Sequence, residues 1–207
     1  MHEYFSHVIN VAGDGHCGFR AVAHLLGKSE DNHHMIRLDL LTELVHNKAR
    51  YFQLFGGKDK LDYLKDALTP AGIGDADEDK WLTMPDMGFL LAQRYKHMVV
   101  LLAGNDEYSE MYFLLEGAPP YQERLMCLGW VNENHFMVVY LKPSSPIPSV
   151  SPMWDKYCSD NASTWPDKFV DRMTAYNNLK RSHGGIVVEV RYLSSGCVLR
   201  DYRAFVA

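Results

Sequence analysis

The chain has 207 residues, of which 47% are hydrophobic, and this is enough apolar material for one folded domain with a sizeable core. Its formal net charge is −5, and the 21 Lys and Arg residues are dispersed along the sequence. This composition argues against a disordered chain and against direct binding to nucleic acid.

The first residues lack the basic start and apolar run of a signal peptide, and no apolar stretch is long enough to cross a bilayer. We therefore expect a cytoplasmic or nuclear protein without membrane association. The cysteines form no C-x-x-C pair, which argues against a disulfide framework and against a tetrahedral zinc site (Cys17, Cys127, Cys158 and Cys197). The sequence predicts neither a metal nor a cofactor.

A short extended segment at residues 8–11 is followed by a glycine-rich turn, and apolar positions at helical spacing then predict a helix over residues 17–26. A second, amphipathic helix is predicted over residues 31–50. We expect Glu43 to lie on its exposed face and four apolar side chains to form its core face (Met35, Leu38, Leu41 and Val45).

His33 and His34 lie on this second helix, where adjacent side chains point in different directions, so we expect surface residues and not a metal-chelating pair. Leucines at residues 61, 64 and 68 mark a short third helix. The glycine-rich, acidic stretch at residues 70–80 is typical of a solvated loop.

A further helix is predicted over residues 85–95, with Thr83 as its N-cap and a proline in its first turn. We expect Leu90 and Leu91 to face the core, together with Arg94 and Tyr95. Four strands follow, at residues 98–103, 111–115, 125–131 and 135–141. Because helices come first and strands cluster later, the sequence predicts an α+β fold, with helices packed on a mixed sheet.

The proline- and serine-rich stretch at residues 142–152 predicts that the compact domain spans residues 1–142, followed by an extension of unknown role at residues 143–207. Aromatic and apolar residues of this extension are expected to form a helix that packs back on the domain (Trp154, Trp165, Phe169 and Met173). Residues 186–193 and 197–206 have the pattern of a β-hairpin.

Cys17 stands at the glycine-hinged turn, directly before the first helix. Unpaired N–H groups and the dipole at a helix N-terminus favour a thiolate, and a tight turn with Gly13 and Gly15 aims backbone amides inward. Two interpretations follow: Cys17 is a nucleophile beside an oxyanion hole, or it is a small buried hydrophobic residue at an ordinary turn.

His135 lies between a short polar turn and an apolar strand, at the rim of a rigid element, which is a suitable place for a general base. Considered alone, a histidine at such a position is more often structural. Paired with Cys17, it becomes the candidate base.

Residues 14–21 resemble the D-G-x-C-x-x-R-A block of the OTU (ovarian tumour) family of cysteine proteases, most of which remove ubiquitin from proteins. Trp81, followed by a helix and a strand, agrees with the family's plan, and so does His135, which begins a late strand and precedes the aromatic Phe136. The resemblance implies a papain-like OTU fold and a thiol-dependent deubiquitinase that acts on conjugates of ubiquitin or a ubiquitin-like protein. The amino-acid sequences of these blocks are similar to those of OTU domains in transposase-related proteins.

Many OTU enzymes carry an aspartate or asparagine two residues after the catalytic histidine, where this chain has Met137. Asp14 resembles the aspartate assigned in the family's first block, so we predict Asp14 as the third catalytic residue. Alternatively, Asp14 braces the cysteine loop by accepting backbone hydrogen bonds. Three asparagines are then the other candidates for the third residue (Asn10, Asn132 and Asn134).

The mechanism that the resemblance implies is acyl transfer. Cys17 attacks the isopeptide carbonyl, His135 takes and returns the proton, and amides near residues 13–15 and at Cys17 hold the oxyanion. The departure at Met137 leaves a second hypothesis, a catalytically weak or inactive ubiquitin-binding module. The sequence indicates neither linkage preference nor oligomeric state.

Overall fold

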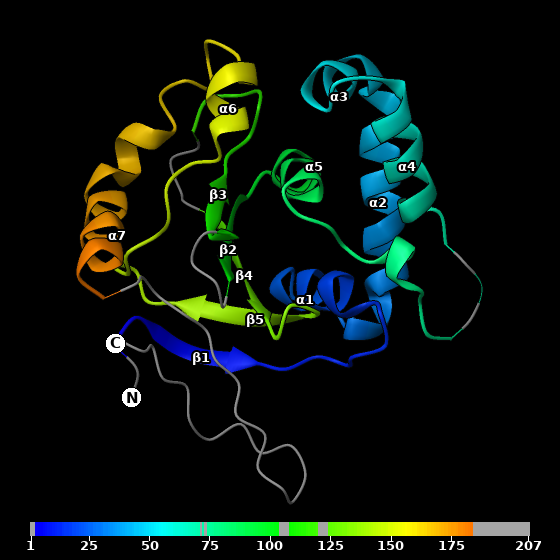
Figure 1. The fold of residues 1–207 in the computed structure, drawn as a ribbon, viewed down its shortest axis with the longest axis horizontal. Helices are drawn as coiled ribbons and strands as arrows, with labels where there is room; N and C mark the ends of the chain where they lie inside the picture. Colours follow the sequence, from blue (N-terminus) through cyan, green and yellow to red (C-terminus); the bar gives the residue numbers. More distant parts are fainter. Residues whose placement is uncertain (1–2, 71, 73, 104–107, 120–123, 184–207) are drawn as a thin grey trace, which may run out of the picture.

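The computed structural model describes residues 3–70, 72, 74–103, 108–119 and 124–183. These residues form an α+β fold with a five-stranded mixed sheet, in the order β1-β5-β4-β2-β3 (Figure 1). The predicted hairpin at residues 186–206 lies outside the described residues. The part of the chain that the structure describes contains no helix long and apolar enough to cross a membrane.

The strands are β1 (Phe5–Ile9), β2 (Met98–Ala103), β3 (Glu110–Tyr112), β4 (Leu125–Val131) and β5 (His135–Leu141). β2 and β4 run parallel, and the other neighbouring pairs are antiparallel. Three of the four predicted strands are thus confirmed at their bounds, whereas β3 is shorter than predicted and β1 begins earlier than the extended segment expected at residues 8–11.

The tight turn between β4 and β5 fixes the position of His135. Asn132 and Glu133 have φ values of 52° and 57°, and the Asn134 N–H donates to the carbonyl oxygen of Val131 at 3.3 Å. Positive φ at both central residues is the geometry that matches the twist of an antiparallel pair. The turn therefore places His135 at the first position of β5.

The helices are α1 (Cys17–Leu25), α2 (His33–His46), α3 (Lys48–Leu54), α4 (Lys58–Leu68), α5 (Asp86–Tyr95), α6 (Pro152–Tyr157) and α7 (Val170–His183). α2, α3 and α4 form a group at one side of the molecule, and α6 and α7 lie at the other side (Figure 1). α1 packs on β5 and β4, while α5 packs on β2 and β3.

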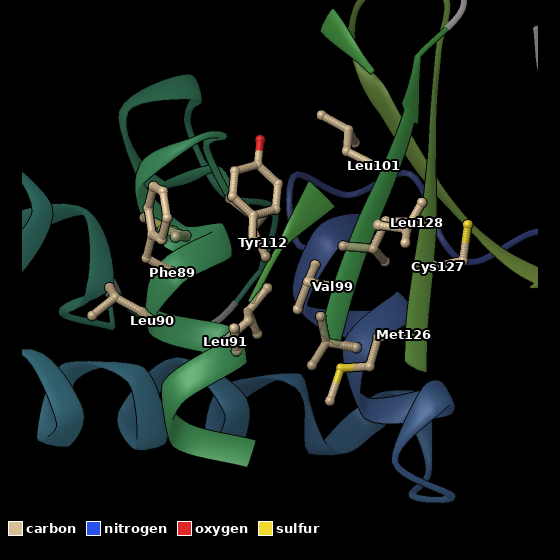
Figure 2. Packing of buried hydrophobic residues seen from close by; sticks show 14 of the residues in the cluster. Phe89, Leu90, Leu91, Val99, Leu101, Tyr112, Met126, Cys127 and Leu128 are labelled. Atoms are coloured by element: carbon tan, nitrogen blue, oxygen red, sulfur yellow. The ribbon is translucent and has the colours of Figure 1, made fainter. Parts of the chain in front are cut away.

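The interface between α5 and the sheet is closely packed. Figure 2 shows Leu91 of α5 and Val99 of β2 in the apolar layer between them, and both side chains are buried. Gly88 lets the helix approach, because a Cβ atom there would lie 2.8 Å from the Tyr112 ring. This packing anchors the sheet that carries β5.

Of the four residues predicted for the core face of the second helix, Leu41 is partly buried and packs against the core, and the other three are exposed. Met35, Leu38 and Val45 are 47%, 39% and 50% exposed, and the buried apolar side chains are instead one position away (Ile36, Leu40 and Leu44). α2 is apolar on both faces, and it packs against α1, α4 and α5 through the face that the spacing did not favour.

The second helix also ends earlier than predicted. α2 stops at His46, and the separate helix α3 starts at Lys48. Glu43, expected on the exposed face, is only 11% exposed and accepts hydrogen bonds from the Tyr51 hydroxyl at 2.9 Å and from the Arg50 guanidinium at 3.3 Å. These hydrogen bonds hold the Glu43 carboxylate at the junction between α2 and α3.

Leu40→Ala is expected to lower the free energy of unfolding by about 2–5 kcal/mol, because it leaves a cavity beneath α2. The matched control is Leu38→Ala on the exposed face, which is expected to change stability by no more than about 0.5 kcal/mol. Urea denaturation of the two variants checks the assignment. Equal losses of stability, or a larger loss for Leu38→Ala, would contradict it.

The start of α5 differs from the prediction as well. Pro85 occupies the N-cap position, and the Thr83 hydroxyl is buried with no hydrogen-bond partner among the described residues, so Thr83 is not a side-chain cap. Leu90 and Leu91 are buried as expected. Arg94 is exposed instead of facing the core. Its guanidinium forms an ion pair with the Asp39 carboxylate at 2.6 Å.

The described part of the extension packs on the domain, as expected for its aromatic residues. Trp154, Trp165 and Phe169 surround Phe113, with ring centroids 5.4, 5.3 and 5.4 Å away. The Trp154 indole N–H donates to the carbonyl oxygen of Leu114 at 2.8 Å. These contacts fill the core next to β3.

Candidate active site

Cys17 is the first residue of α1 and is 6% exposed. The preceding turn requires glycine at residue 15, where φ is +78° and a Cβ atom would lie 2.2 Å from the carbonyl oxygen of Ala76. The Ala76 N–H in turn donates to the carbonyl oxygen of Asp14 at 2.9 Å. The loop at residues 70–80 therefore holds the cysteine turn in place.

Asp14 braces this turn from within. Its carboxylate lies 2.6 Å from Arg20 Nη2 and accepts the His16 N–H at 3.1 Å. Partial burial alone would raise the pKa of Asp14, but the hydrogen bonds from Arg20 and His16 outweigh it and lower the pKa to about 2. The side chain is thus a permanent anion that fixes the loop.

In the described structure the Asp14 carboxylate contacts the cysteine loop and not the His135 ring. The structure realises the alternative role, the brace of the cysteine loop, and shows no hydrogen bond from His135 to Asp14 among the described residues. The sequence pattern could not separate the two roles, because a carboxylate three residues before the cysteine can turn to either side of the loop.

Asn10 is the residue that contacts the histidine. His135 Nε2–H donates to Asn10 Oδ1 at 2.8 Å. With the proton on Nε2, the neutral ring leaves Nδ1 without a proton, and this edge faces the backbone of Gly13, where a Cβ atom would lie 3.7 Å from Nδ1. Asn10 thus holds the imidazole in one orientation, with Nδ1 free of a proton.

The cysteine and the histidine strand are joined through a backbone group. The N–H of Phe136, the residue after His135, donates to Cys17 Sγ at 3.4 Å. No hydrogen bond between Sγ and the His135 ring occurs within the described part of the chain. The thiol sulfur is therefore held at the start of β5, next to the residue His135.

The electrostatics of this state favour neutral groups. Burial raises the pKa of the Cys17 thiol above its usual value, and the N–H groups of Phe136 and Gly18 offset only part of that effect. Burial also lowers the pKa of His135. Both shifts disfavour a thiolate–imidazolium ion pair in this state.

The rate of alkylation of Cys17 by iodoacetamide is accordingly expected to rise with pH through the neutral range and beyond the usual cysteine pKa of about 8.5, because only the thiolate reacts. Peptide mapping separates Cys17 from the more exposed Cys158, and Cys17→Ala supplies the background. A rate that is already constant from about pH 6 upward would show a preformed ion pair and contradict this prediction.

The other two candidate asparagines lie in the exposed β4–β5 turn. Asn132 lines a groove of about 730 Å³, and Asn134 donates its backbone N–H within the turn. Neither side chain is hydrogen-bonded to His135 in the described structure. Asn10 is therefore the asparagine that the geometry selects.

The groove lies close to the first turn of α1. Its walls are largely aromatic and apolar, with two acidic residues among them (Trp81, Leu82, Tyr108, Trp130, Phe136, Glu78 and Glu133). Leu82 and Phe136 also border Gly18, where a Cβ atom would lie 2.5 Å from Leu82 Cβ and 3.0 Å from the Phe136 ring. Two residues of the groove wall therefore pack against the first turn of α1, which carries Cys17.

The histidines of α2 differ from the expectation of two surface residues. His33 is half-buried and stacks on the His16 ring at 4.3 Å, whereas His34 is exposed. Within the described residues, no group of three or more His, Cys, Asp or Glu side chains is arranged to hold a metal ion.

Two features of the site have no sequence signal. The Phe136 N–H is a backbone donor, whose direction depends on the pairing of β5. Arg37 donates to His16 Nδ1 at 3.1 Å and is 2% exposed, although charged side chains on helices are usually placed on the surface.

Sequence comparison supplies one relative. The chain is 27% identical over 140 residues to the Arabidopsis thaliana protein named OVARIAN TUMOR DOMAIN-containing deubiquitinating enzyme 9. The alignment covers 67% of this chain but only 36% of that protein, so the chain spans about a third of its relative's length. No protein-family model matches the chain.

Structural comparison gives the fold. The OTU domain protease of Farallon virus has a TM-score of 0.50 at 19% identity, over 68% of this chain and 86% of the viral chain. The OTU domain protease of Qalyub virus also has a TM-score of 0.50, at 14% identity and with the same coverage of 68% and 86%. The chain therefore has the fold of OTU domains, and its sequence is similar to that of an OTU-domain deubiquitinating enzyme.

Proposed function

We propose that this protein is a thiol-dependent deubiquitinase that hydrolyses isopeptide bonds at the C-terminus of ubiquitin or of a ubiquitin-like protein. The observation that carries the proposal is the Asn10–His135 hydrogen bond of 2.8 Å, which leaves Nδ1 of His135 as a base beside the turn of Cys17. The name of the Arabidopsis relative supports the same activity.

The first chemical step uses the neutral pair directly. As Sγ leaves the Phe136 N–H and approaches the substrate carbonyl carbon, Nδ1 of His135 takes the thiol proton, and an S–C bond forms. The C–N bond then breaks as the imidazolium returns that proton to the departing lysine amine. Water, activated by the same imidazole, hydrolyses the thioester.

The oxyanion is assigned to the N-terminus of α1. The His16 N–H is already bonded to Asp14, whereas the N–H groups of Cys17 and Gly18 belong to the first turn of the helix, which has no intrahelical acceptors for them. Donors of this kind stabilise the negative charge that develops in the transition state, and each contributes about 3–4 kcal/mol.

The aromatic groove is assigned to the substrate segment that precedes the scissile bond. Two of its wall residues, Leu82 and Phe136, pack against Gly18, the residue after Cys17, so the groove lies near the proposed nucleophile. The acidic residues Glu78 and Glu133 favour a segment with basic side chains.

Asn10 is proposed as the positioning residue of the site. Asn10→Ala is expected to lower kcat by about ten- to a hundredfold with little change in KM, because the imidazole loses its fixed tautomer and orientation. Asn10→Asp keeps an oxygen acceptor and is expected to restore most of the activity. Steady-state kinetics on a fluorogenic ubiquitin substrate measure both variants.

Asp14→Asn is the matched comparison, and it is expected to act through stability. The low pKa of Asp14 means that its ionised form stabilises the fold above the unfolded-state pKa of about 4, and that this contribution is lost as the pH falls towards 2. The melting temperatures of wild type and variant should therefore differ at neutral pH and converge in acid. A selective loss of kcat in Asp14→Asn, with an unaffected Asn10→Ala, would reverse the assignment.

We propose residues 1–142 as the catalytic unit, with the described extension at residues 143–183 closing the core beside β3. The direct test of the activity is incubation with ubiquitin chains of defined linkage, with Cys17→Ala in parallel. Release of monoubiquitin by the wild type alone supports the proposal. Binding of the chains without cleavage would favour the inactive ubiquitin-binding module, consistent with the methionine at residue 137.

A further inference from the structure

A second cavity lies on the other side of the cysteine turn, and the proposed mechanism does not use it. It has a volume of about 380 Å³ and is lined by six cationic or imidazole side chains (His16, Arg20, His33, His34, Arg37 and Lys80). Neither Cys17 nor His135 is among the described residues that line it. It is therefore distinct from the aromatic groove.

Arg37 is the central feature of this cavity. The side chain is 2% exposed, and its guanidinium donates to the carbonyl oxygens of Ala67 at 2.6 Å and Lys80 at 2.7 Å. A third bond goes to His16 Nδ1 at 3.1 Å, and the guanidinium lies 4.0 Å from the centroid of the Phe19 ring. All of these partners are neutral acceptors or an aromatic face.

No carboxylate forms an ion pair with Arg37 among the residues that the structure describes. A buried cation without a counter-charge is costly, and burial lowers the pKa of Arg37 to about 10. Its three bonds leave two of the five guanidinium N–H donors for another acceptor. The cavity thus contains the positive charge of Arg37, which has no counter-charge among the described residues and two N–H groups that donate no hydrogen bond there.

The other full cations of the cavity are already neutralised. Arg20 Nη2 lies 2.6 Å from the Asp14 carboxylate, and Lys80 Nζ lies 2.6 Å from the Asp66 carboxylate. The acidic residues on the wall are Asp14, which is bound to Arg20, and the exposed Asp75. Neither carboxylate compensates Arg37.

His33 provides a second, independent observation. Its Nδ1 atom is buried and has no hydrogen-bond partner within the described structure. Burial is the main cause that lowers the pKa of His33 to about 4, and the nearby His16 and Arg20 contribute in the same direction. A polar atom of this kind normally has a partner, either from the protein or from a bound molecule.

The adjacent His16 ring is fixed in one tautomer. Because Arg37 donates to its Nδ1, His16 carries its proton on Nε2 and donates to the carbonyl oxygen of Gly74 at 3.1 Å. His33 stacks on this ring at 4.3 Å. The cavity is therefore a set of rigidly held donors beside the loop at residues 14–20.

We propose that the cavity is a binding site for a small inorganic oxyanion of the phosphate or sulfate class. Such an anion supplies the missing counter-charge for Arg37 and several acceptor oxygens for the free guanidinium N–H groups and for the His33 ring, with a proton on Nδ1. Since the site shares residues 14–20 with the catalytic turn but not its groove, the oxyanion is a ligand of the fold and not the hydrolysed substrate.

The test is calorimetric titration of the full chain with inorganic phosphate and with sulfate, in chloride buffer at constant ionic strength. Saturable binding with one site is expected. His33→Phe keeps the ring stacking but removes the nitrogen, and it is expected to weaken binding by about tenfold or more, as is Arg37→Gln. His46→Phe, at the exposed opposite end of α2, is the control and is expected to bind as the wild type does.

Circular dichroism establishes that each variant is folded before titration, and His33→Phe carries the test if Arg37→Gln does not fold. The histidine Cε1–H proton signals in NMR spectra provide a second measurement, in which phosphate is expected to shift His33 and leave His46 unchanged. Absence of saturable binding to the wild type would overturn the proposal. Equal affinity in His33→Phe, Arg37→Gln and His46→Phe would overturn it as well, because it would show only general charge attraction.

Discussion

His135→Ala is expected to lower kcat on a ubiquitin substrate by about a hundred- to ten-thousandfold, because the thiol loses the base that takes its proton. The effect is large because the resting Cys17 thiol is protonated and its pKa is raised by burial, so a spontaneous thiolate is scarce. Cys17→Ala is expected to abolish turnover entirely. Single-turnover kinetics at pH 7 measure both variants.

The control for this prediction is His24→Ala, in which the substituted histidine lies in the last turn of the same helix as Cys17. It is expected to keep turnover close to that of the wild type. The activity of His135→Ala should recover partly at high pH, where the thiolate forms without a base. A pH-independent residual rate in His135→Ala, or a loss in His24→Ala of the same size, would contradict the role of His135 as the base.

Gly15→Ala is expected to have the second large effect, a loss of both stability and activity. Its Cβ would lie 2.2 Å from the carbonyl oxygen of Ala76 and 2.8 Å from Trp81 Nε1, so the cysteine turn must separate from the loop at residues 70–80. The positive φ alone costs about 1–2 kcal/mol for a residue with a Cβ atom. Since this separation displaces Cys17, kcat should fall at least about tenfold.

Gly27→Ala separates backbone strain from the clash. Its φ of +71° is similar to that of Gly15, but no heavy atom lies within 4 Å of its Cβ position. The free energy of unfolding of this variant is expected to fall by about 1–2 kcal/mol, which is the cost of the positive φ, and kcat is expected to stay unchanged. Thermal melts and kinetics of the two variants test this. Equal effects of the two substitutions would show that the contact with Ala76 does not hold the turn.

The sequence correctly predicted those elements whose residue pattern is compatible with only one type of secondary structure. β2, β4 and β5 are short apolar runs bounded by polar turns, and α1 begins at a glycine-hinged turn, so their bounds agree closely with the structure. The positions of Cys17 and His135 relative to these elements followed as well. Local pattern was sufficient because each strand is a continuous apolar run with a polar segment at its ends, and β2 is buried at every position.

α2 shows where local pattern was insufficient. It has apolar residues on both faces. Whether Leu38 or Leu40 is buried depends on where α1, α4 and α5 pack, and the spacing of apolar residues gives no information about that packing. The buried Arg37 was missed for the same reason, since its acceptors lie on distant carbonyls of Ala67 and Lys80.

The sequence left the choice between Asp14 and Asn10 open, because it depends on a contact between distant segments. Asn10 and His135 are separated by 125 positions and meet because β1 pairs with β5. Asp14 lies nearer to Cys17 in sequence but is captured by Arg20, six positions further on. A motif-based assignment could not determine which of these two contacts forms.

The central claim is that Cys17 is a nucleophile directed at the C-terminus of a ubiquitin-type modifier. Its most direct test is reaction of the wild type with a ubiquitin probe that carries a thiol-reactive C-terminal group, followed by mass spectrometry of the adduct. The account predicts one adduct, located at Cys17, formed slowly by Asn10→Ala and not at all by Cys17→Ala. No adduct with ubiquitin or any ubiquitin-like probe, or an adduct that persists in Cys17→Ala, would contradict the account.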